Sequence, residues 1–336
     1  MSAARSYLVT GGTGFLGSAL VRRLLTDGHR VRVIDNDWRG RASRLADLAD
    51  ACEMVEADVR DTDAVARAVR GVDCVCHLAF INGTRHFYQQ PELVLDVAVR
   101  GMLAVLDGCR THDVRDLLVM SSSEVYQTPP VIPTDESVPL SIPDPLNPRY
   151  SYAGGKLISE LMALNYGRRN FERVTVVRPH NVYGPDMGWE HVIPQFVVRM
   201  RELMDRYQGL LPFPIQGTGD ETRAFVFVDD FIDGVLCVLE RGLHRGIYHV
   251  GTEEEVSIRT VADTTAAFFG RAIEIVPGTP APGGTARRCP DISRVRGLGY
   301  APRVRFTEGL PVVARWYDEH FSERPISDAG DTCPSP

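Results

Sequence analysis

The chain has 336 residues, of which 44% are apolar and 24% are charged, and its formal net charge is −7 at pH 7. This length suits one large or two fused domains, and the composition is that of an ordinary soluble globular protein. The negative charge provides no basic field that would attract nucleic acid or an anionic membrane, so we expect neither as a partner.

Short runs rich in β-branched residues alternate with helical patterns along the first 180 residues. The runs predict strands at 6–10, 30–35, 52–57, 73–79, 116–122 and 173–179. Amphipathic stretches between them, such as 15–28 and 62–71, predict helices. Such βαβ alternation predicts an α/β fold of the Rossmann type, a doubly wound parallel sheet with helices on both faces.

The rest of the chain has a different rhythm. Residues 127–150 contain seven prolines and predict a rigid loop, because neither a helix interior nor a central strand accepts proline. Beyond about residue 180 the pattern is mixed, with strand, turn and strand expected within 212–231 and a loop at 279–285. We expect a Rossmann domain over 1–180, to which parts of 225–250 return, a smaller C-terminal α/β lobe over 181–323 and a flexible tail over 324–336.

A glycine-rich loop follows the first predicted strand. Gly11 permits a tight turn, Gly14 lets the backbone approach a pyrophosphate, and Gly17 lies at the start of the next helix, whose amides attract anions. Asp35 ends the second strand, where a carboxylate accepts hydrogen bonds from the adenosine ribose diol. This pattern predicts NAD as cofactor, although two nearby arginines leave NADP as a minority alternative: Arg39 and Arg41.

Other residues are expected to contact the cofactor because they follow these glycines or the ends of strands, where a doubly wound sheet binds its ligand. They are Phe15, Leu16, Asn36, Asp58, Val59, Leu78, Ala79 and Pro179.

Tyr152 and Lys156 are four residues apart on a predicted helix, so both side chains can point toward one cleft. A phenol has a pKa of about 10, and a nearby ammonium and the positive nicotinamide would lower it toward neutrality. Tyr152 is then a candidate base for a sugar or alcohol hydroxyl. Serines 121 to 123, at the end of the preceding strand, can orient the reacting oxygen.

The sequence resembles the extended short-chain dehydrogenase/reductase family, in particular its nucleotide-sugar epimerases and dehydratases. The resemblance covers nearly the whole chain, through the motifs TGGTGFLG, VID, ADVRD, HLA, SSSEVY, YAGGK, RPHNVYGP, TRAFVFVDD and YHVGT in the family's order. It implies that the Rossmann domain binds NAD and that the C-terminal lobe binds a nucleotide sugar.

Residue roles follow from the same resemblance. It implies that Ser122 is the catalytic serine, Tyr152 the base and Lys156 the ribose-binding residue that lowers the phenol pKa. The expected substrate-binding residues are Ser123, Asn181, Arg223 and one of Arg287 and Arg288, between which the sequence does not choose. The chain departs from the family at Ala98 and Met102, where an asparagine motif is usual, so support from that helix is in doubt.

The reaction depends on Glu124, which follows Ser122 and Ser123. The family's 4,6-dehydratases have Thr-Asp-Glu here, and without the Asp no obvious donor protonates a leaving C6 hydroxyl. We therefore expect an NAD-dependent nucleotide-sugar 4-epimerase that acts through a transient 4-keto sugar and enzyme-bound NADH. The alternative is a nucleotide-glucuronate decarboxylase or a dehydratase that uses Glu124 as a catalytic residue, and a non-catalytic NAD-sensing regulator ranks last.

Three further expectations concern assembly, metal content and location. Helices 91–110 and 152–166 are apolar almost all round, which favours a homodimer in which they form a four-helix bundle. The seven scattered cysteines show no zinc spacing, so we expect no metal. Neither a signal peptide nor a spanning run is seen, which indicates a cytoplasmic protein.

Overall fold

The computed structural model describes residues 3–279 and 285–325, so most of the predicted loop at 279–285 and tail at 324–336 lie outside the described residues. Its centre is a seven-stranded sheet in the order β11-β6-β5-β4-β1-β2-β3, and every neighbouring pair is parallel. The strands are β1 (Ser6–Thr10), β2 (Arg30–Asp35), β3 (Cys52–Glu56), β4 (Cys74–His77), β5 (Asp116–Met120), β6 (Arg173–Pro179) and β11 (Gly246–Val250).

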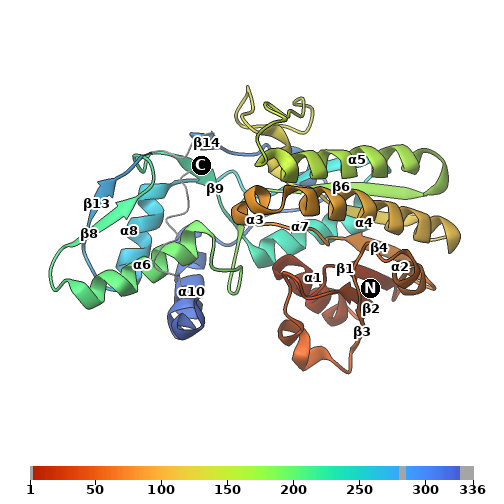
Figure 1. Cartoon of the computed structure of the whole chain (residues 1–336), viewed down its shortest axis with the longest axis horizontal. Coiled ribbons are helices and arrows are strands. Elements are labelled where there is room, and N and C mark those ends of the chain that lie inside the picture. Colours follow the sequence, from red (N-terminus) through yellow and green to blue (C-terminus); the bar gives the residue numbers. More distant parts are fainter. Residues whose placement is uncertain (1–2, 280–284, 326–336) are drawn as a thin grey trace.

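Helices cover both faces of this sheet (Figure 1). One face carries α1 (Phe15–Thr26) and α7 (Val228–Arg241), and the other carries α2 (Thr62–Val69), α4 (Pro91–Thr111) and α5 (Tyr150–Asn170). Along β1, Tyr7 and Val9 belong to one apolar core and Leu8 to the other, because successive side chains point to opposite faces. The predicted α/β Rossmann-type fold is confirmed.

Three predicted strands end earlier than the sequence indicated. The runs expected to 57, 79 and 122 stop at Glu56, His77 and Met120. The residues that follow have left the ladder and line the cavity described below. Neither the alternation of side chains nor β-propensity marks the end of these strands, because the residues that line a ligand site beyond them are also apolar or small.

The second lobe lies beyond the carboxyl ends of these strands (Figure 1). Helices α6 (Val192–Arg206), α8 (Ile258–Phe268) and α10 (Phe306–Glu319) pack together beside the parallel pair β8 (Leu211–Ile215) and β13 (Ile273–Pro277). A small sheet places β9 (Thr222–Ala224) between β12 (Glu255–Ser257) and β14 (Arg287–Arg288). The pair β7 (Val182–Tyr183) and β10 (Val226–Phe227) joins this lobe to α7.

Short elements complete the chain: η1 (Ala42–Leu48), α3 (Thr84–Gln89), η2 (Ser123–Tyr126), α9 (Ser293–Arg296) and η3 (Phe321–Glu323). Residues 128–149 contain neither helix nor strand, as the prolines predict, and one isolated bridge ties Thr134 to Pro290. This loop connects η2 to α5, which begins at Tyr150. No helix among the described residues has both the length and the apolar character that a membrane crossing requires.

Candidate active site

The carboxyl ends of the parallel strands open into a cavity of about 530 Å³. Most of the residues that the sequence singled out line it, although they come from distant parts of the chain. They are Gly11, Gly14, Phe15, Leu16, Gly17, Asp35, Asn36, Asp58, Val59, Leu78, Ala79, Ser122, Ser123, Glu124, Tyr152, Lys156, Pro179, Asn181 and Arg288. Of the expected substrate-binding residues, Arg223 and Arg287 are not among its lining residues, and neither is Arg41.

The glycine loop has the geometry that a dinucleotide requires. Gly11 adopts φ +71°, and a Cβ there would lie 2.7 Å from the backbone nitrogen of Ala79, while a Cβ on Gly17 would lie 2.1 Å from the Gly11 carbonyl oxygen. Gly14 caps α1, and no side chain among the described residues caps the first amides of this helix. The residues of this first turn line the cavity, so their amides can bind a pyrophosphate.

Asp35 is placed beside this loop. Its Oδ2 accepts a hydrogen bond from the Thr13 backbone at 3.0 Å, and its Oδ1 accepts one from the Asp37 backbone at 3.0 Å. Each carboxylate oxygen retains acceptor capacity for a ribose hydroxyl. The residues present therefore fit a dinucleotide whose adenosine end lies between β1 and β2.

Tyr152 and Lys156 share one face of α5, as their spacing predicts. Lys156 is buried, and its Nζ donates to the Met120 carbonyl oxygen at 2.7 Å and lies 3.8 Å from the centre of the Phe80 ring. Burial lowers the pKa of Lys156 to about 7, against the opposing effect of Glu160. Burial also raises the pKa of Tyr152 to about 12, while its hydrogen bond with Ser122 acts in the opposite direction. The protein groups alone thus do not produce the expected low phenol pKa.

The three serines after β5 have different surroundings. Ser121 donates its hydroxyl to Glu160 in a buried contact, so it is already engaged. Ser122 begins the η2 turn, where its Oγ accepts a hydrogen bond from the Glu124 backbone at 3.2 Å. The hydrogen bond between Ser122 and Tyr152 distinguishes Ser122 from Ser121, whose hydroxyl is bound to Glu160.

Glu124 forms an ion pair with Arg288. Burial opposes its ionisation, but the attraction and hydrogen bond of Arg288, together with the charges of Arg149 and Arg223, hold the pKa of Glu124 below its usual value. Arg149, which also lines the cavity, was not singled out from the sequence, since it lies in the proline-rich loop outside any motif.

The small sheet of the second lobe separates the two arginines that the sequence could not distinguish. Arg288 pairs in register with Arg223 across β14 and β9, so these side chains share a face, whereas Arg287 pairs with Thr222 and points to the other face. There Arg287 binds Glu255 at 2.5 Å. Burial and the neighbouring Arg288 lower the pKa of Arg223 to about 10. Arg288 is therefore the arginine that reaches the cavity.

The remaining substrate candidate is Asn181, which adopts φ +42° and whose Nδ2 lies 3.4 Å from the Ala224 carbonyl oxygen. The departures noted in α4 prove to be buried positions. Ala98 offers only its carbonyl oxygen, which accepts from Ser159 Oγ at 3.3 Å, and Met102 belongs to the apolar core. Helix α4 thus contributes no polar side chain at these two places.

Two aromatic residues that sequence reasoning missed surround the phenol. Phe87 stacks on Tyr152 with ring centres 4.8 Å apart, and Phe80 meets it edge-on at 5.3 Å. Both belong to the segment after β4, which has no periodic pattern and gave no signal beyond the aromatic residues themselves. They fix the orientation of the Tyr152 ring.

Comparison with known proteins agrees with this arrangement. The model of the NAD dependent epimerase/dehydratase family matches residues 7–251. A UDP-glucose 4-epimerase of Mycolicibacterium smegmatis is 32% identical, with 92% of this chain and 97% of that protein covered. The UDP-glucuronic acid decarboxylase 1 of Arabidopsis thaliana is 31% identical, with 90% of this chain and 68% of that protein covered.

Solved structures show the same architecture. The dTDP-glucose 4,6-dehydratase of Streptomyces venezuelae, solved with NAD bound, is 31% identical with a TM-score of 0.82, covering 95% of this chain and 98% of that chain. Three different reactions are thus represented among relatives of similar identity. The family match and the cavity around the glycine loop lead to one conclusion: the chain belongs to the NAD-dependent epimerase/dehydratase family, with NAD as its cofactor.

Proposed function

We propose that the protein is a nucleotide-sugar 4-epimerase that acts through a transient 4-keto sugar. The observation that carries this proposal is the placement of Ser122, Tyr152 and Lys156 in the same cavity as the glycine loop. When bound, NAD supplies reversible hydride transfer at the sugar C4. The residues of the chain must then accept and return the C4 hydroxyl proton and allow the keto sugar to present either face.

Tyr152 is the proposed proton acceptor. To accept a proton Tyr152 must be a phenolate, and since the protein groups alone hold its pKa at about 12, its ionisation would rely on the positive charges of bound NAD⁺ and of Lys156. Lys156 is charged to a substantial degree near neutrality, because its pKa is about 7, and its ammonium can stabilise a phenolate formed during the reaction. Ser122 orients the reacting oxygen through its hydroxyl.

Glu124 favours epimerisation over loss of water. Among the described residues that line the cavity, the carboxylates are Asp35, Asp58 and Glu124, and only Glu124 lies at the end near Tyr152. Its ion pair with Arg288 lowers its pKa, which makes it a weak base for a C5 proton and a poor proton donor for a C6 hydroxyl. Epimerisation at C4 requires neither step.

We assign the nucleotide diphosphate to the lobe over 181–323. The guanidiniums of Arg223 and Arg288 share a face of the small sheet, and their mutual repulsion is relieved by an anion. Asn181 lines the cavity beside them and completes the proposed site.

A second candidate, decarboxylation of a nucleotide uronate, is supported by one observation. Three arginines act on Glu124, namely Arg149, Arg223 and Arg288, so the end of the cavity near the sugar carries more positive than negative charge. Such an excess also suits a sugar carboxylate. Glu124→Gln distinguishes the two candidates, since this isosteric change should spare most of an epimerase's rate and strongly reduce that of an enzyme that needs the carboxylate.

The test of the main proposal is a panel of UDP- and dTDP-sugars, with products identified by NMR. We expect wild-type protein to give the C4 epimer and Tyr152→Phe to lose at least roughly a hundredfold in rate, because the phenol hydroxyl is the proton acceptor. Tyr152→Phe should still retain NAD, which serves as the control for folding. Near wild-type turnover by this variant would contradict the assignment of the base.

We also propose a homodimer through α4 and α5, which pack side by side (Figure 1). Leu95 on α4 is 41% exposed and Leu161 on α5 is 48% exposed. Apolar side chains of this size on two adjacent helices suit a four-helix interface. Leu161→Arg should shift the protein toward monomers in sedimentation analysis, and an unchanged dimer would exclude this face.

A further inference from the structure

Two segments from opposite sides of the cavity meet at its adenosine end. The first, residues 36–44, follows β2, and the second, residues 184–191, follows β7 in the other lobe. Arg39 and Arg44 of the first segment line the cavity. Since the sequence left NADP open because of arginines in the first segment, the partners of these side chains decide whether they are available to a phosphate.

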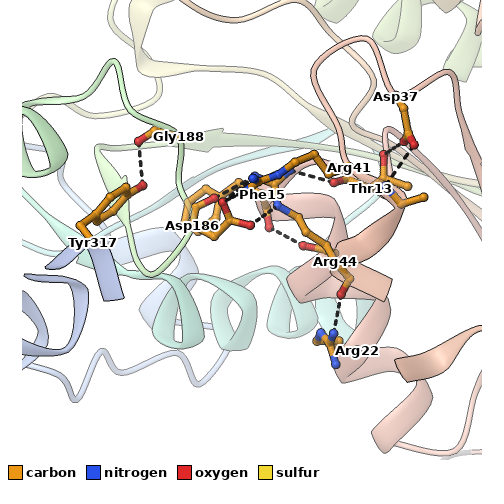
Figure 2. Close-up of polar contacts among 11 residues, drawn as sticks. Thr13, Phe15, Arg22, Asp37, Arg41, Arg44, Asp186, Gly188 and Tyr317 are labelled. Atoms are coloured by element: carbon orange, nitrogen blue, oxygen red, sulfur yellow. Dashed lines mark hydrogen bonds and ion pairs between the residues drawn. The ribbon is translucent and has the colours of Figure 1, made fainter. Parts of the chain in front are cut away.

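Asp186 of the second segment binds two arginines of the first segment, Arg41 and Arg44 (Figure 2). Arg44 Nε donates to Asp186 Oδ2 at 2.7 Å, and Arg44 Nη2 donates to Asp186 Oδ1 at 3.1 Å and to its carbonyl oxygen at 2.9 Å. Arg41 Nη2 donates to the same Oδ1. The side chains of Arg44 and Asp186 are only 12% and 22% exposed, so this contact is shielded from solvent more than most surface pairs.

Arg44 also lies directly beside the ribose site. Arg44 Nη1 donates to the Thr13 carbonyl oxygen at 3.0 Å, and the Thr13 backbone nitrogen is the group that binds Asp35. Thr13 also donates its hydroxyl to Asp37 at 2.7 Å (Figure 2). The guanidinium of Arg44 is therefore one residue away from the carboxylate that faces the ribose diol.

Arg39 is held in a similar but weaker way. Its Nη1 lies 3.5 Å from Glu190 of the second segment and 3.1 Å from His86 Nε2. The side chains of Arg39 and Glu190 are 34% and 43% exposed, so solvent screens this pair more than the Asp186 contacts.

We propose that Asp186, supported by Glu190, determines the preference for NAD over NADP by occupying the arginines that would otherwise bind a 2′-phosphate. A phosphate dianion is bound by guanidiniums whose donors are free to form charge-assisted hydrogen bonds. Asp186 both engages these donors and neutralises their charge, and it does so from the lobe opposite Asp35. The proposal concerns the cofactor alone and holds whichever reaction the sugar undergoes.

Asp186→Asn is the variant that isolates the charge. Asp186 adopts φ +56°, a left-handed conformation that asparagine tolerates as well as aspartate does, so the substitution leaves the backbone unstrained. The control is Asp318→Asn, which removes an acid from a more exposed pair with Arg201 at 2.7 Å between α6 and α10, away from the cavity.

The experiment is a competition on the full chain. Each protein is equilibrated with an equal mixture of NAD⁺ and NADP⁺ and desalted, and the retained cofactors are quantified by chromatography. Calorimetry with adenosine 2′,5′-bisphosphate and 5′-AMP then tests the adenosine end alone. We expect Asp186→Asn to raise the ratio of NADP to NAD by about tenfold, the effect of one charge-assisted hydrogen bond gained.

Asp186→Asn combined with Glu190→Gln should raise the ratio further, while Asp318→Asn should leave it unchanged. NAD should remain preferred in all variants, because Asp35 and Asp37 still repel a 2′-phosphate. An unchanged ratio in both Asp186 variants would overturn the proposal. This includes the outcome in which the affinities for the two cofactors fall together, since Asp186 would then only tie the lobes to each other.

Discussion

The buried ion pair between Glu160 and Arg178 supports the strand ends on which the site is built. Glu160 lies one helical turn after Lys156 on α5, and both side chains of the pair are 2% exposed. Glu160 accepts from Arg178 Nε at 2.9 Å and Nη2 at 2.6 Å, and also from Ser121. Glu160→Gln would leave a buried guanidinium without its counter-charge and turn an amide group toward its donors.

The expected loss in the free energy of unfolding is about 3–5 kcal/mol, the range for breaking one partner of a buried pair. That is a large part of the roughly 5–15 kcal/mol that a folded domain has available. Urea denaturation measures the loss, and Asp107→Asn is the control, because its pair with Arg110 is half exposed and should be worth at most about 0.5 kcal/mol. A loss below about 1 kcal/mol for Glu160→Gln would refute this account.

Two further predictions concern single positions. Burial and the nearby Lys156 charge lower the pKa of His77 to about 3, so the folded protein keeps this imidazole neutral while the unfolded chain binds a proton below about pH 6.5. The free energy of unfolding should therefore fall as the pH falls from 6.5, and His77 should contribute up to about 1.4 kcal/mol per pH unit to this fall. In urea titrations between pH 7 and 5, His77→Asn should show a shallower fall. An equally steep fall in the variant would contradict this. Gly154 and Gly155 are neighbours on α5, but a Cβ on Gly154 would meet only Ile142 at 3.8 Å, whereas one on Gly155 would lie 2.8 Å from the Ala98 Cβ. Gly154→Ala should raise the melting temperature, because alanine stabilises a helix by about 0.5–1 kcal/mol relative to glycine. Gly155→Ala should lower the melting temperature, because its Cβ has no space. Equal shifts for the two variants would show that space at these positions does not decide the effect.

The architecture was predictable because its signals are local. The strands of the first domain could be placed from β-branched runs, and the glycine loop and the Tyr152–Lys156 spacing each lie within a few residues of one element. Tertiary contacts were not predictable in this way. Arg288 differs from Arg287 only through its register against Arg223, and this register is set by the pairing of two short strands far apart in the chain.

The same limit applies to the surroundings of the site. The contact of Asp186 with Arg41 and Arg44 joins two segments with no pattern in common, and Phe87 reaches Tyr152 from a short helix without a motif. The sequence also suggested that Lys156 and the positive nicotinamide would together lower the phenol pKa. Within the protein alone, burial and the Glu124 charge outweigh the hydrogen bond with Ser122, so the pKa of Tyr152 is raised.

The most direct test of the proposed 4-epimerisation is to run the reaction in D₂O with the nucleotide sugar that the panel identifies. Epimerisation removes and returns hydrogen only at C4, so we predict a C4-epimeric product without solvent deuterium at C5. Deuterium at C5, release of CO₂ or loss of water would contradict the account, because each requires chemistry at C5 that a paired and ionised Glu124 is not expected to support.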